Sequence, residues 1–309
     1  MPRQFRRKRV LIVGCGNVGL RCAQELRRFS TVFGTSRTPQ YEALQPLNIR
    51  PLALNLDANT SVNRKRNIAR LASWIIYLVP PPNTGDMDTR LKYFLTRVSN
   101  THPSSVNAKF NSKKTGRLVY ISTSGVYGNC QGELFDETRP VSPQSERAIR
   151  RLNAERQLRA AGKKGLRISI VRTPGIYSPN RLPTRHLQQR SPILLAEEDV
   201  YTNHIHTEDL ANICIRALFQ GKPNRIYHAS DDSSLKMGDY FDAVAQASNL
   251  PLAPRLSATE IKTQLSPTLW SFMRESRRLK NQRIKTELRI RLRYPTVYEG
   301  LAALKPRQV

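Results

Sequence analysis

Short apolar runs of strand length alternate with longer amphipathic stretches through the first half of the chain. The clearest runs cover residues 10–13, 74–79 and 117–122. Runs without a polar face are typical of central strands in a parallel sheet that is covered on both sides. Because they alternate with helical patterns as far as Arg172, the pattern predicts an α/β fold with a doubly wound parallel sheet.

The second half of the chain is less regular. Several prolines in residues 174–199 predict loops with short elements, whereas the pattern over residues 265–280 predicts a helix. The chain therefore divides into a larger sheet domain and a smaller lobe. We expect the sheet domain to span residues 1–173, with 200–229 returning to it, and the lobe to consist of 174–199 and 230–309.

A glycine turn follows the first apolar run, in the sequence VLIVGCGNVGLRCAQEL of residues 10–26. In this G-x-G-x-x-G layout Gly14 permits a tight turn, Gly16 lets the backbone approach a pyrophosphate, and Gly19 allows close packing of helix and strand. The free N–H groups of the helix N-terminus then face the phosphates. An ordinary strand-turn-helix is the alternative, but the flanking strand and helix favour the dinucleotide-binding loop of a Rossmann-type domain.

The next strand ends about 20 residues beyond the glycine loop, where this fold meets the adenosine ribose. An acidic residue there would bind the ribose 2′-hydroxyl and repel a 2′-phosphate, but the chain has Thr35, Ser36 and Arg37. Hydroxyls and a guanidinium favour NADP, although NAD stays open and Arg37 could be an ordinary exposed turn residue. The candidate cofactor contacts, in the loop and at the strand ends, are Gly14, Cys15, Gly16, Asn17, Val18, Gly19, Ser36, Arg37, Asn55, Leu56, Val79, Pro80 and Ser122.

The chain is strongly basic, with 51 Lys and Arg against 23 Asp and Glu and a formal net charge of +28. A field of this sign attracts phosphates, whether of a cofactor, a metabolite or a nucleic acid. The excess is dispersed, and no zinc finger, helix-turn-helix or RNA-binding signature accompanies it, so we do not expect nucleic-acid recognition.

Four cysteines without a C-x-x-C spacing indicate neither a disulfide framework nor a zinc site, and they favour a reducing compartment. No apolar run is long enough to cross a bilayer, and the basic N-terminus does not fit a secretory signal. We therefore expect a cytoplasmic protein with no membrane contact. His204 and His206 could form half of a metal site, but without a third ligand nearby we expect no metal.

The segment YISTSGVYG of residues 120–128 resembles the strand-end motif of the extended short-chain dehydrogenase/reductases, the NAD-dependent epimerase/dehydratase superfamily. Residues 276–281 and 292–296, with Gly300, resemble its atypical YeeZ-like branch. Weaker matches between them follow the family order: Glu133, Asp136-Glu137, Pro140, Ala154-Glu155, Arg172 with Tyr177 and Pro179, and residues 206–211. Many relatives form dimers, so a homodimer is among the assemblies that the resemblance implies.

The resemblance implies a catalytic tyrosine, a lysine four residues later and a Ser or Thr that orients the substrate oxygen. Thr123 matches the Ser/Thr position. Arg147 stands where the tyrosine is expected and Arg151 where the lysine is expected, so the Tyr-x-x-x-Lys pair is absent. Arginine stays protonated, so Arg147 is a poor proton shuttle. Because the tyrosine is absent, Arg151 has no adjacent phenol whose pKa it could lower.

The resemblance thus implies an NAD(P)-binding oxidoreductase or epimerase, with a small substrate that is phosphorylated or linked to a nucleotide. Whether turnover occurs stays open, because the usual proton donor is missing. The alternative is a non-catalytic sensor or binding module for NADP(H). Tyr127 or Tyr177 could restore an acid to the site, but tyrosines of these motifs are more often packing residues.

Overall fold

The computed structural model describes residues 7–37, 44–57, 71–99, 116–265 and 267–303. The chain forms two compact units, each assembled from three segments. The first comprises Met1–Ser122, Ile149–Val171 and Ala211–Tyr227, and the second comprises Thr123–Ala148, Arg172–Leu210 and His228–Val309. By this division residues 123–148 belong to the second unit, while the domain boundaries expected from the sequence remain a prediction.

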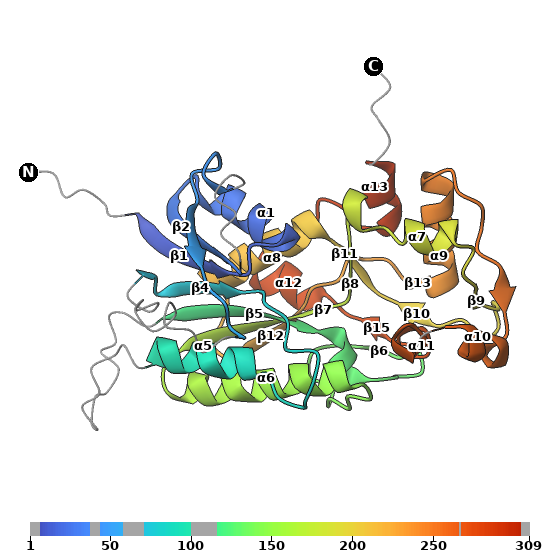
Figure 1. Ribbon diagram of the computed structural model, residues 1–309, viewed down its shortest axis with the longest axis horizontal. Helices are drawn as coiled ribbons and strands as arrows, with labels where there is room; N and C mark the ends of the chain where they lie inside the picture. Colours follow the sequence, from blue (N-terminus) through green and yellow to red (C-terminus); the bar gives the residue numbers. More distant parts are fainter. Residues whose placement is uncertain (1–6, 38–43, 58–70, 100–115, 266, 304–309) are drawn as a thin grey trace, which may run out of the picture. The chain divides into compact units, whose positions relative to one another are not determined.

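The core of the first unit is a sheet whose seven described strands follow the order β12-β7-β5-β4-β1-β2-β3 (Figure 1). The pairs from β3 to β5 along this order are parallel. The order reverses between β1 and β4, which makes the sheet doubly wound, as predicted. The strands are β1 (Lys8–Val13), β2 (Ser30–Ser36), β3 (Arg50–Ala53), β4 (Trp74–Tyr77), β5 (Arg117–Thr123), β7 (Arg167–Thr173) and β12 (Arg225–His228).

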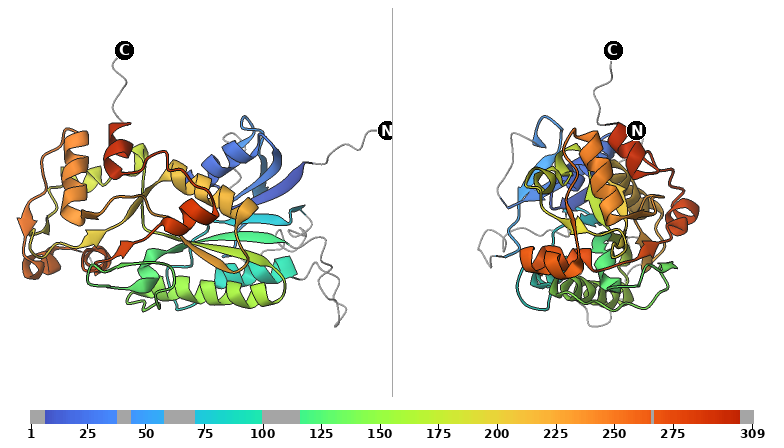
Figure 2. Two further views of the ribbon diagram at one scale, coloured as in Figure 1. Left: turned by 180° about the vertical axis from the view of Figure 1, so that it is seen from behind. Right: turned by 90° about the vertical axis from the view of Figure 1, so that its right-hand side faces the viewer.

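Helices cover both faces of this sheet (Figures 1 and 2). On one face lie α1 (Asn17–Leu26) and the part of α8 (Thr207–Gln220) that belongs to the first unit; the Phe219 ring packs 4.7 Å from that of Trp74 on β4. On the other face lie α5 (Thr89–Ser99) and α6 (Glu146–Lys163), where the rings of Tyr77 and Phe94 are 5.1 Å apart. Burial on both faces explains why the central strands are continuously apolar.

The second unit contains short strands that pair two by two. They are β8 (Gly175–Tyr177) with β11 (His204–His206), β10 (Tyr201–Thr202) with β13 (Leu235–Lys236), β9 (Ile193–Leu194) with β14 (Arg255–Leu256), and β6 (Leu134–Phe135) with β15 (Arg278–Leu279). Its helical segments are η2 (Ser124–Tyr127), η3 (Pro179–Arg181), α7 (Thr184–Gln188), α9 (Met237–Ala247), α10 (Ala258–Gln264), α11 (Pro267–Met273), α12 (Gln282–Glu287) and α13 (Val297–Ala302). Its core includes Tyr177, Leu187, Val244 and Val297.

The helix predicted over residues 265–280 is wrong in its second half. The helix α11 ends at Met273, and Arg278 and Leu279 form β15 instead. Arg278 N donates to Glu133 O at 3.0 Å and Lys280 N donates to Phe135 O at 2.8 Å. Pairing with a distant strand thus overrides the local helical pattern.

Within the described residues, no helix combines the length and the apolar character that crossing a membrane requires.

Candidate functional site

The three glycines of the loop after β1 occupy positions that a side chain would disturb in different ways. Gly14 has a φ of 97°, a left-handed value that favours glycine, and a Cβ there would lie 3.0 Å from Val79 Cγ2. A Cβ on Gly19 would clash with the carbonyl oxygen of Gly14, so Gly19 lets α1 pack closely against the turn. A Cβ on Gly16 would meet no protein atom within 4 Å. Open space therefore lies beside the backbone of Gly16.

The N-terminus of α1 begins at this open space without a side-chain cap, because Gly16 is its N-cap residue. The first N–H groups of the helix, those of Asn17, Val18 and Gly19, have no partner within the helix. The Oδ1 atom of Asn17 is buried and has no hydrogen-bond partner in the described part of the chain. Unpaired donors, the positive end of the helix dipole and free space together fit a phosphate group.

The end of β2 supports the glycine turn and presents the residues predicted to meet the ribose. Thr35 Oγ1 accepts a hydrogen bond from Gly14 N at 3.1 Å, and Thr35 O accepts one from Cys15 N at 2.8 Å. Burial raises the pKa of Cys15 to about 12, so its thiol is inert. Ser36 is half-buried, whereas Arg37 is exposed and makes no hydrogen bond or ion pair with the other described residues.

Arg90 on α5 joins two strand-end loops, and the sequence analysis missed it. Its Nε and Nη2 atoms contact Oδ1 and Oδ2 of Asp57 at 2.5 and 2.8 Å. Its Nη1 atom donates to the carbonyl oxygens of Pro80 and Pro81 at 2.9 and 3.2 Å. The hydrogen bonds from Arg90 lower the pKa of Asp57. Arg90 thus fixes the loops that follow β3 and β4, but a single arginine near the start of a helix carries no sequence signature.

The other predicted cofactor contacts lie in these same loops. Asn55 Oδ1 accepts a hydrogen bond from Asp57 N at 3.0 Å, which shapes the loop after β3. Leu56 is half-buried and packs against the core of the first unit. Val79 lies beside the Gly14 turn, and Pro80 is exposed. The structure therefore brings Val79 to the glycine loop, and Arg90 joins the loop that holds Asn55 to the one that holds Pro80.

The strand β5 ends with Ser122 and Thr123, whose hydroxyl groups make different hydrogen bonds. Ser122 is buried and donates to Oε1 of Glu155 at 2.6 Å, so its proton is used within the protein. Thr123 is half-buried, and its Oγ1 caps η2 by accepting from Gly125 N at 3.1 Å. A Cβ on Gly125 would lie 3.4 Å from Thr123 Oγ1 and 3.8 Å from Ala148 Cβ. The turn that holds Thr123 thus packs beside the first turn of α6.

The arginines at the expected Tyr and Lys positions lie one turn apart on α6. Arg147 Nη1 donates to Ser271 Oγ at 2.9 Å, and burial lowers the pKa of its guanidinium, against the attraction of Glu275. Arg151 Nη1 donates to Tyr120 Oη at 3.0 Å and to Ile121 O at 2.8 Å. The two guanidinium groups therefore hold different partners.

A phenol does lie beside Arg151, which the sequence analysis did not expect. Tyr120 belongs to β5, and its ring lies 5.6 Å below the guanidinium carbon of Arg151. Burial raises the pKa of Tyr120 to about 12, and the charge of Arg151 opposes this only in part. The phenol therefore stays protonated at neutral pH and is not an activated base.

Neither Tyr127 nor Tyr177 offers its hydroxyl to solvent, because both side chains are buried. His228 Nδ1 faces Lys280 O at 3.0 Å, and since a carbonyl only accepts, Nδ1 carries the proton. His228 Nε2 therefore accepts from Tyr127 Oη at 2.6 Å, and Tyr127 Oη accepts from Arg172 Nη1 at 2.7 Å. Tyr177 Oη donates to the carbonyl oxygen of Thr296 at 3.3 Å. Both hydroxyls are bound within the protein.

His204 and His206 pack against aromatic rings. The ring centroid of His204 lies 3.9 Å from that of Tyr240, and that of His206 lies 4.0 Å from that of Tyr294. Burial lowers the pKa of His204 to about 3. In the described ranges no group of three or more His, Cys, Asp and Glu side chains is arranged to hold a metal ion.

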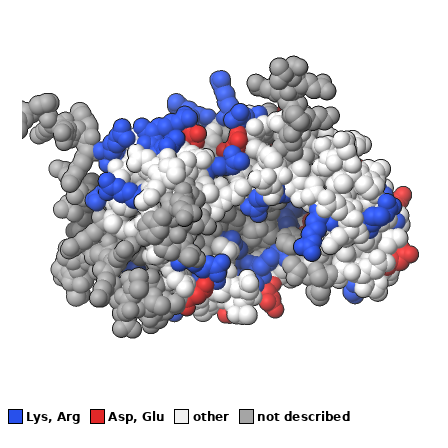
Figure 3. All heavy atoms as spheres, turned by 45° about the horizontal axis from the view of Figure 1, so that its top comes forward, with Lys and Arg blue, Asp and Glu red and all other residues white. Residues whose placement is uncertain are grey.

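Lys and Arg side chains are scattered over the face seen in Figure 3, where they predominate over Asp and Glu. This distribution agrees with the dispersed positive charge of the sequence. It favours anionic ligands in general and selects no particular one.

The comparison with protein families matches residues 91–230 to the NAD dependent epimerase/dehydratase family. Among curated proteins, the dTDP-D-glucose 4,6-dehydratases of human and cattle are each 25% identical over 121 residues. That match covers 36% of this chain and 35% of the human protein, about a third of its length. The family match thus agrees with the resemblance seen in the sequence motifs.

Solved structures of the same fold cover nearly the whole chain. A conserved protein of unknown function from Silicibacter pomeroyi has a TM-score of 0.78 and 26% identity, and the match covers 96% of this chain and 98% of that one. The UDP-glucuronic acid 4-epimerase of Bacillus cereus, solved with NAD, has a TM-score of 0.71, 15% identity and 96% coverage of both chains. The dTDP-glucose 4,6-dehydratase of Bacillus anthracis, also solved with NAD, has a TM-score of 0.73 and 13% identity, and the match covers 96% of this chain and 95% of that one. The Rossmann-type fold is thus confirmed, while the YeeZ-like branch remains a prediction.

Proposed function

We propose that the chain binds NAD(P) at the glycine loop and acts as an oxidoreductase or epimerase on a small phosphorylated or nucleotide-linked substrate. The observation that carries the proposal is the open, uncapped N-terminus of α1 beside Gly16. The residues present fit such a cofactor, since the uncapped N–H groups of the first turn of α1 are donors from which phosphate oxygens can accept. The family match and the NAD-bound structures of the same fold support it.

Within this proposal NADP is the preferred cofactor. Arg37 is exposed and has no hydrogen bond or ion pair with the other described residues, so its guanidinium is available for a 2′-phosphate. The nearest carboxylate of the loop after β3, Asp57, is already bound by both arms of Arg90. Ser36 would add a hydroxyl donor at the same strand end.

Thr123 and Arg147 would serve the substrate. Thr123 Oγ1 keeps its hydroxyl proton while it accepts from Gly125 N, so it can donate to a substrate oxygen. A guanidinium holds its protons at neutral pH, so Arg147 would stabilise a developing oxyanion instead of transferring a proton. A bound nicotinamide would supply hydride transfer. The large positive charge would attract the anionic part of the substrate.

A non-catalytic sensor is the second candidate, and specific contacts favour it. Arg147 donates to Ser271, Tyr120 stays protonated beside Arg151, and Tyr127 is bound to His228. With these contacts, none of Arg147, Tyr120 and Tyr127 is free to exchange a proton with a substrate. In this case cofactor binding itself would be the function.

Two measurements distinguish these functions. Fluorescence titration with NADPH and NADH tests cofactor binding, and the absence of binding at micromolar concentration for both would refute the proposal. A screen of carbonyl compounds and nucleotide sugars then tests turnover. Turnover that Thr123→Val abolishes would support the enzyme, whereas stoichiometric binding without hydride transfer would support the sensor.

The expectations of a cytoplasmic location and of a homodimer remain predictions. The former is supported by the four cysteines, which are all buried free thiols, as a reducing compartment allows.

A further inference from the structure

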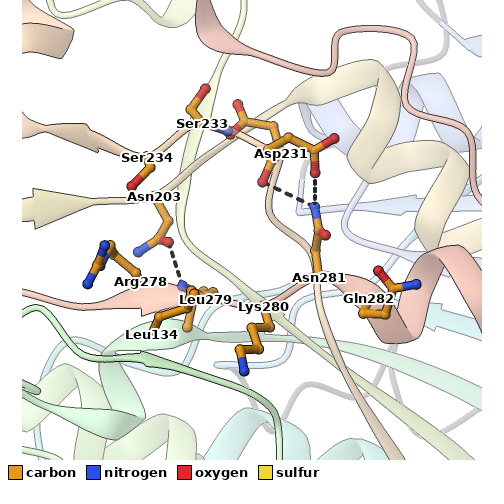
Figure 4. A pocket seen from close by; sticks show the side chains of 11 residues that line it. Leu134, Asn203, Asp231, Ser233, Ser234, Arg278, Leu279, Lys280, Asn281 and Gln282 are labelled. Carbon is orange, nitrogen blue, oxygen red and sulfur yellow. Dashed lines mark hydrogen bonds between the residues drawn. The ribbon is translucent and has the colours of Figure 1, made fainter.

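A pocket of about 470 Å³ lies within the second unit, and none of the residues that line it is assigned above to cofactor or substrate (Figure 4). One side is formed by the segment that follows β12, with Asp231, Ser233 and Ser234. The other is formed by β15 and the residues after it, with Arg278 and Lys280. Pockets of this volume are of the size that binds small metabolites.

Two cations of this pocket lack a counter-charge. Arg278 Nε donates to Gly132 O at 2.7 Å, and its guanidinium lies 4.5 Å from the ring centroid of Tyr201. These contacts fix the guanidinium and leave its two terminal nitrogens without a partner in the described part of the chain. Lys280 is exposed, and its Nζ likewise has no hydrogen bond or ion pair with the described residues. Figure 4 shows that the two side chains leave this segment in different directions, so they provide two separate cations at this side of the pocket.

The carboxylates of the pocket do not neutralise these cations. Asp232 Oδ1 accepts from Asn281 Nδ2 at 2.7 Å and from Lys285 Nζ at 2.6 Å, so its charge is already paired. Asp231 is 3% exposed, and its Oδ1 accepts from Ser233 N at 3.0 Å. Burial raises the pKa of Asp231 to about 7, which weakens its negative charge at neutral pH. The pocket thus keeps a local positive excess.

Hydroxyl and amide groups complete the lining. Ser234 makes no side-chain hydrogen bond within the described residues, and Gln282 is exposed at the pocket. Both can donate and accept, as the hydroxyls of a sugar require. We propose that this pocket is a second small-molecule site, which binds a phosphate monoester of a polyol, with the phosphate at the side of the pocket that carries Arg278 and Lys280. Guanidinium and ammonium groups form strong, charge-assisted hydrogen bonds with phosphate oxygens.

Calorimetry on the full chain tests this site, with glucose 6-phosphate as the probe and glucose as its uncharged counterpart. Glucose 6-phosphate binds and glucose does not, because the phosphate supplies most of the affinity. In Lys280→Gln and in Arg278→Gln the affinity falls by about tenfold or more, as expected for the loss of a charge-assisted hydrogen bond. Arg291→Gln is the matched control, since Arg291 is an exposed cation of the same unit outside the pocket, and it binds as the unmodified chain does.

Several outcomes overturn the proposal. One is the absence of glucose 6-phosphate binding at millimolar concentration. Another is an equal loss in Arg291→Gln, which would indicate a diffuse charge effect. A third is binding that saturating NADPH removes and Lys280→Gln leaves intact, since the phosphate would then occupy the glycine loop. The Lys280 side chain makes no hydrogen bond or ion pair with the described residues, so Lys280→Gln decides the matter even if Arg278→Gln fails to fold. NADPH affinity is unchanged in Lys280→Gln, which keeps this test separate from that of the cofactor site.

Discussion

Arg151 and Tyr120 form a hydrogen bond of 3.0 Å between Nη1 and the phenol oxygen, in the interior of the first unit. The same Nη1 atom donates to Ile121 O at 2.8 Å, so the arginine is bound to β5 through a side chain and a main-chain atom. Arg151 occupies the position where the family resemblance implies a lysine. The guanidinium at this position is thus bound within the first unit.

We expect Arg151→Met and Tyr120→Phe to be coupled in their effects on stability. Removing either partner leaves a buried polar group of the other with fewer hydrogen bonds, at a cost of about 1–3 kcal/mol. The double variant should be less destabilised than the sum of the single variants by about 0.5–3 kcal/mol. Urea unfolding of the four proteins measures the cycle. Additive effects would show that the hydrogen bond contributes no stability.

We expect two substitutions in the glycine loop, three residues apart, to destabilise the chain to different extents. In Gly19→Ala the new Cβ clashes with the carbonyl oxygen of Gly14, and overpacking of this kind costs about 1–3 kcal/mol. The gain in helix propensity of about 0.5–1 kcal/mol does not offset it. In Gly16→Ala the Cβ meets no protein atom, so the loss of stability stays below about 1 kcal/mol.

NADPH affinity separates the two variants further. Gly16→Ala fills the space where the backbone would approach a pyrophosphate, so we expect weaker NADPH binding by a protein that is still folded. Thermal unfolding and fluorescence titration of both variants provide the comparison. Unchanged NADPH affinity in Gly16→Ala would argue that the cofactor does not lie against this residue.

Arg37 should decide the choice between the two nicotinamide cofactors. Arg37→Glu replaces an available guanidinium by a carboxylate, which repels a 2′-phosphate and can accept from a ribose hydroxyl. NADPH affinity should fall by about tenfold or more, while NADH affinity stays within a fewfold. Arg28→Glu, which changes an exposed arginine elsewhere in the first unit, controls for net charge. Equal losses of NADPH affinity in the two variants would remove Arg37 from the site.

The strands of the first unit could be predicted from the sequence because strands that are buried on both faces consist of consecutive apolar residues. Runs such as those of β4 and β5 are apolar on both faces, and the structure buries both faces. The strand β15 could not be predicted, since its two residues are basic and apolar in a stretch with a helical pattern. Its strand conformation comes from hydrogen bonds to Glu133 and Phe135, more than 140 residues away in the chain.

The same limit applies to the candidate site. The roles of Gly14, Gly16 and Gly19 follow from local chain geometry, and the structure shows a separate physical reason for each. The contacts of Arg90 with Asp57 and of Arg147 with Ser271 join residues 33 and 124 positions apart. No local pattern encodes such pairs, because tertiary packing chooses the partner of a long charged side chain.

The buried carboxyl of Asp231 should make stability depend on pH in a direction opposite to that of an ion-paired aspartate. Burial raises its pKa from the usual 3.8 to about 7 in the folded chain. Below the unfolded pKa both states hold the proton, so no free energy is lost. As the pH rises toward 7, the unfolded chain releases the proton while the folded chain keeps it, and stability falls by up to about 1.4 kcal/mol per pH unit.

Asp231→Asn removes this proton, and its amide oxygen can still accept from Ser233 N. The variant should therefore gain stability over the unmodified chain by about 1–3 kcal/mol more at pH 8 than at pH 5. Urea unfolding at the two pH values measures the difference. The histidines titrate alike in both proteins, so their contributions cancel in the comparison. A gain that is equal at both pH values would mean that the Asp231 carboxyl keeps an ordinary pKa in the folded chain.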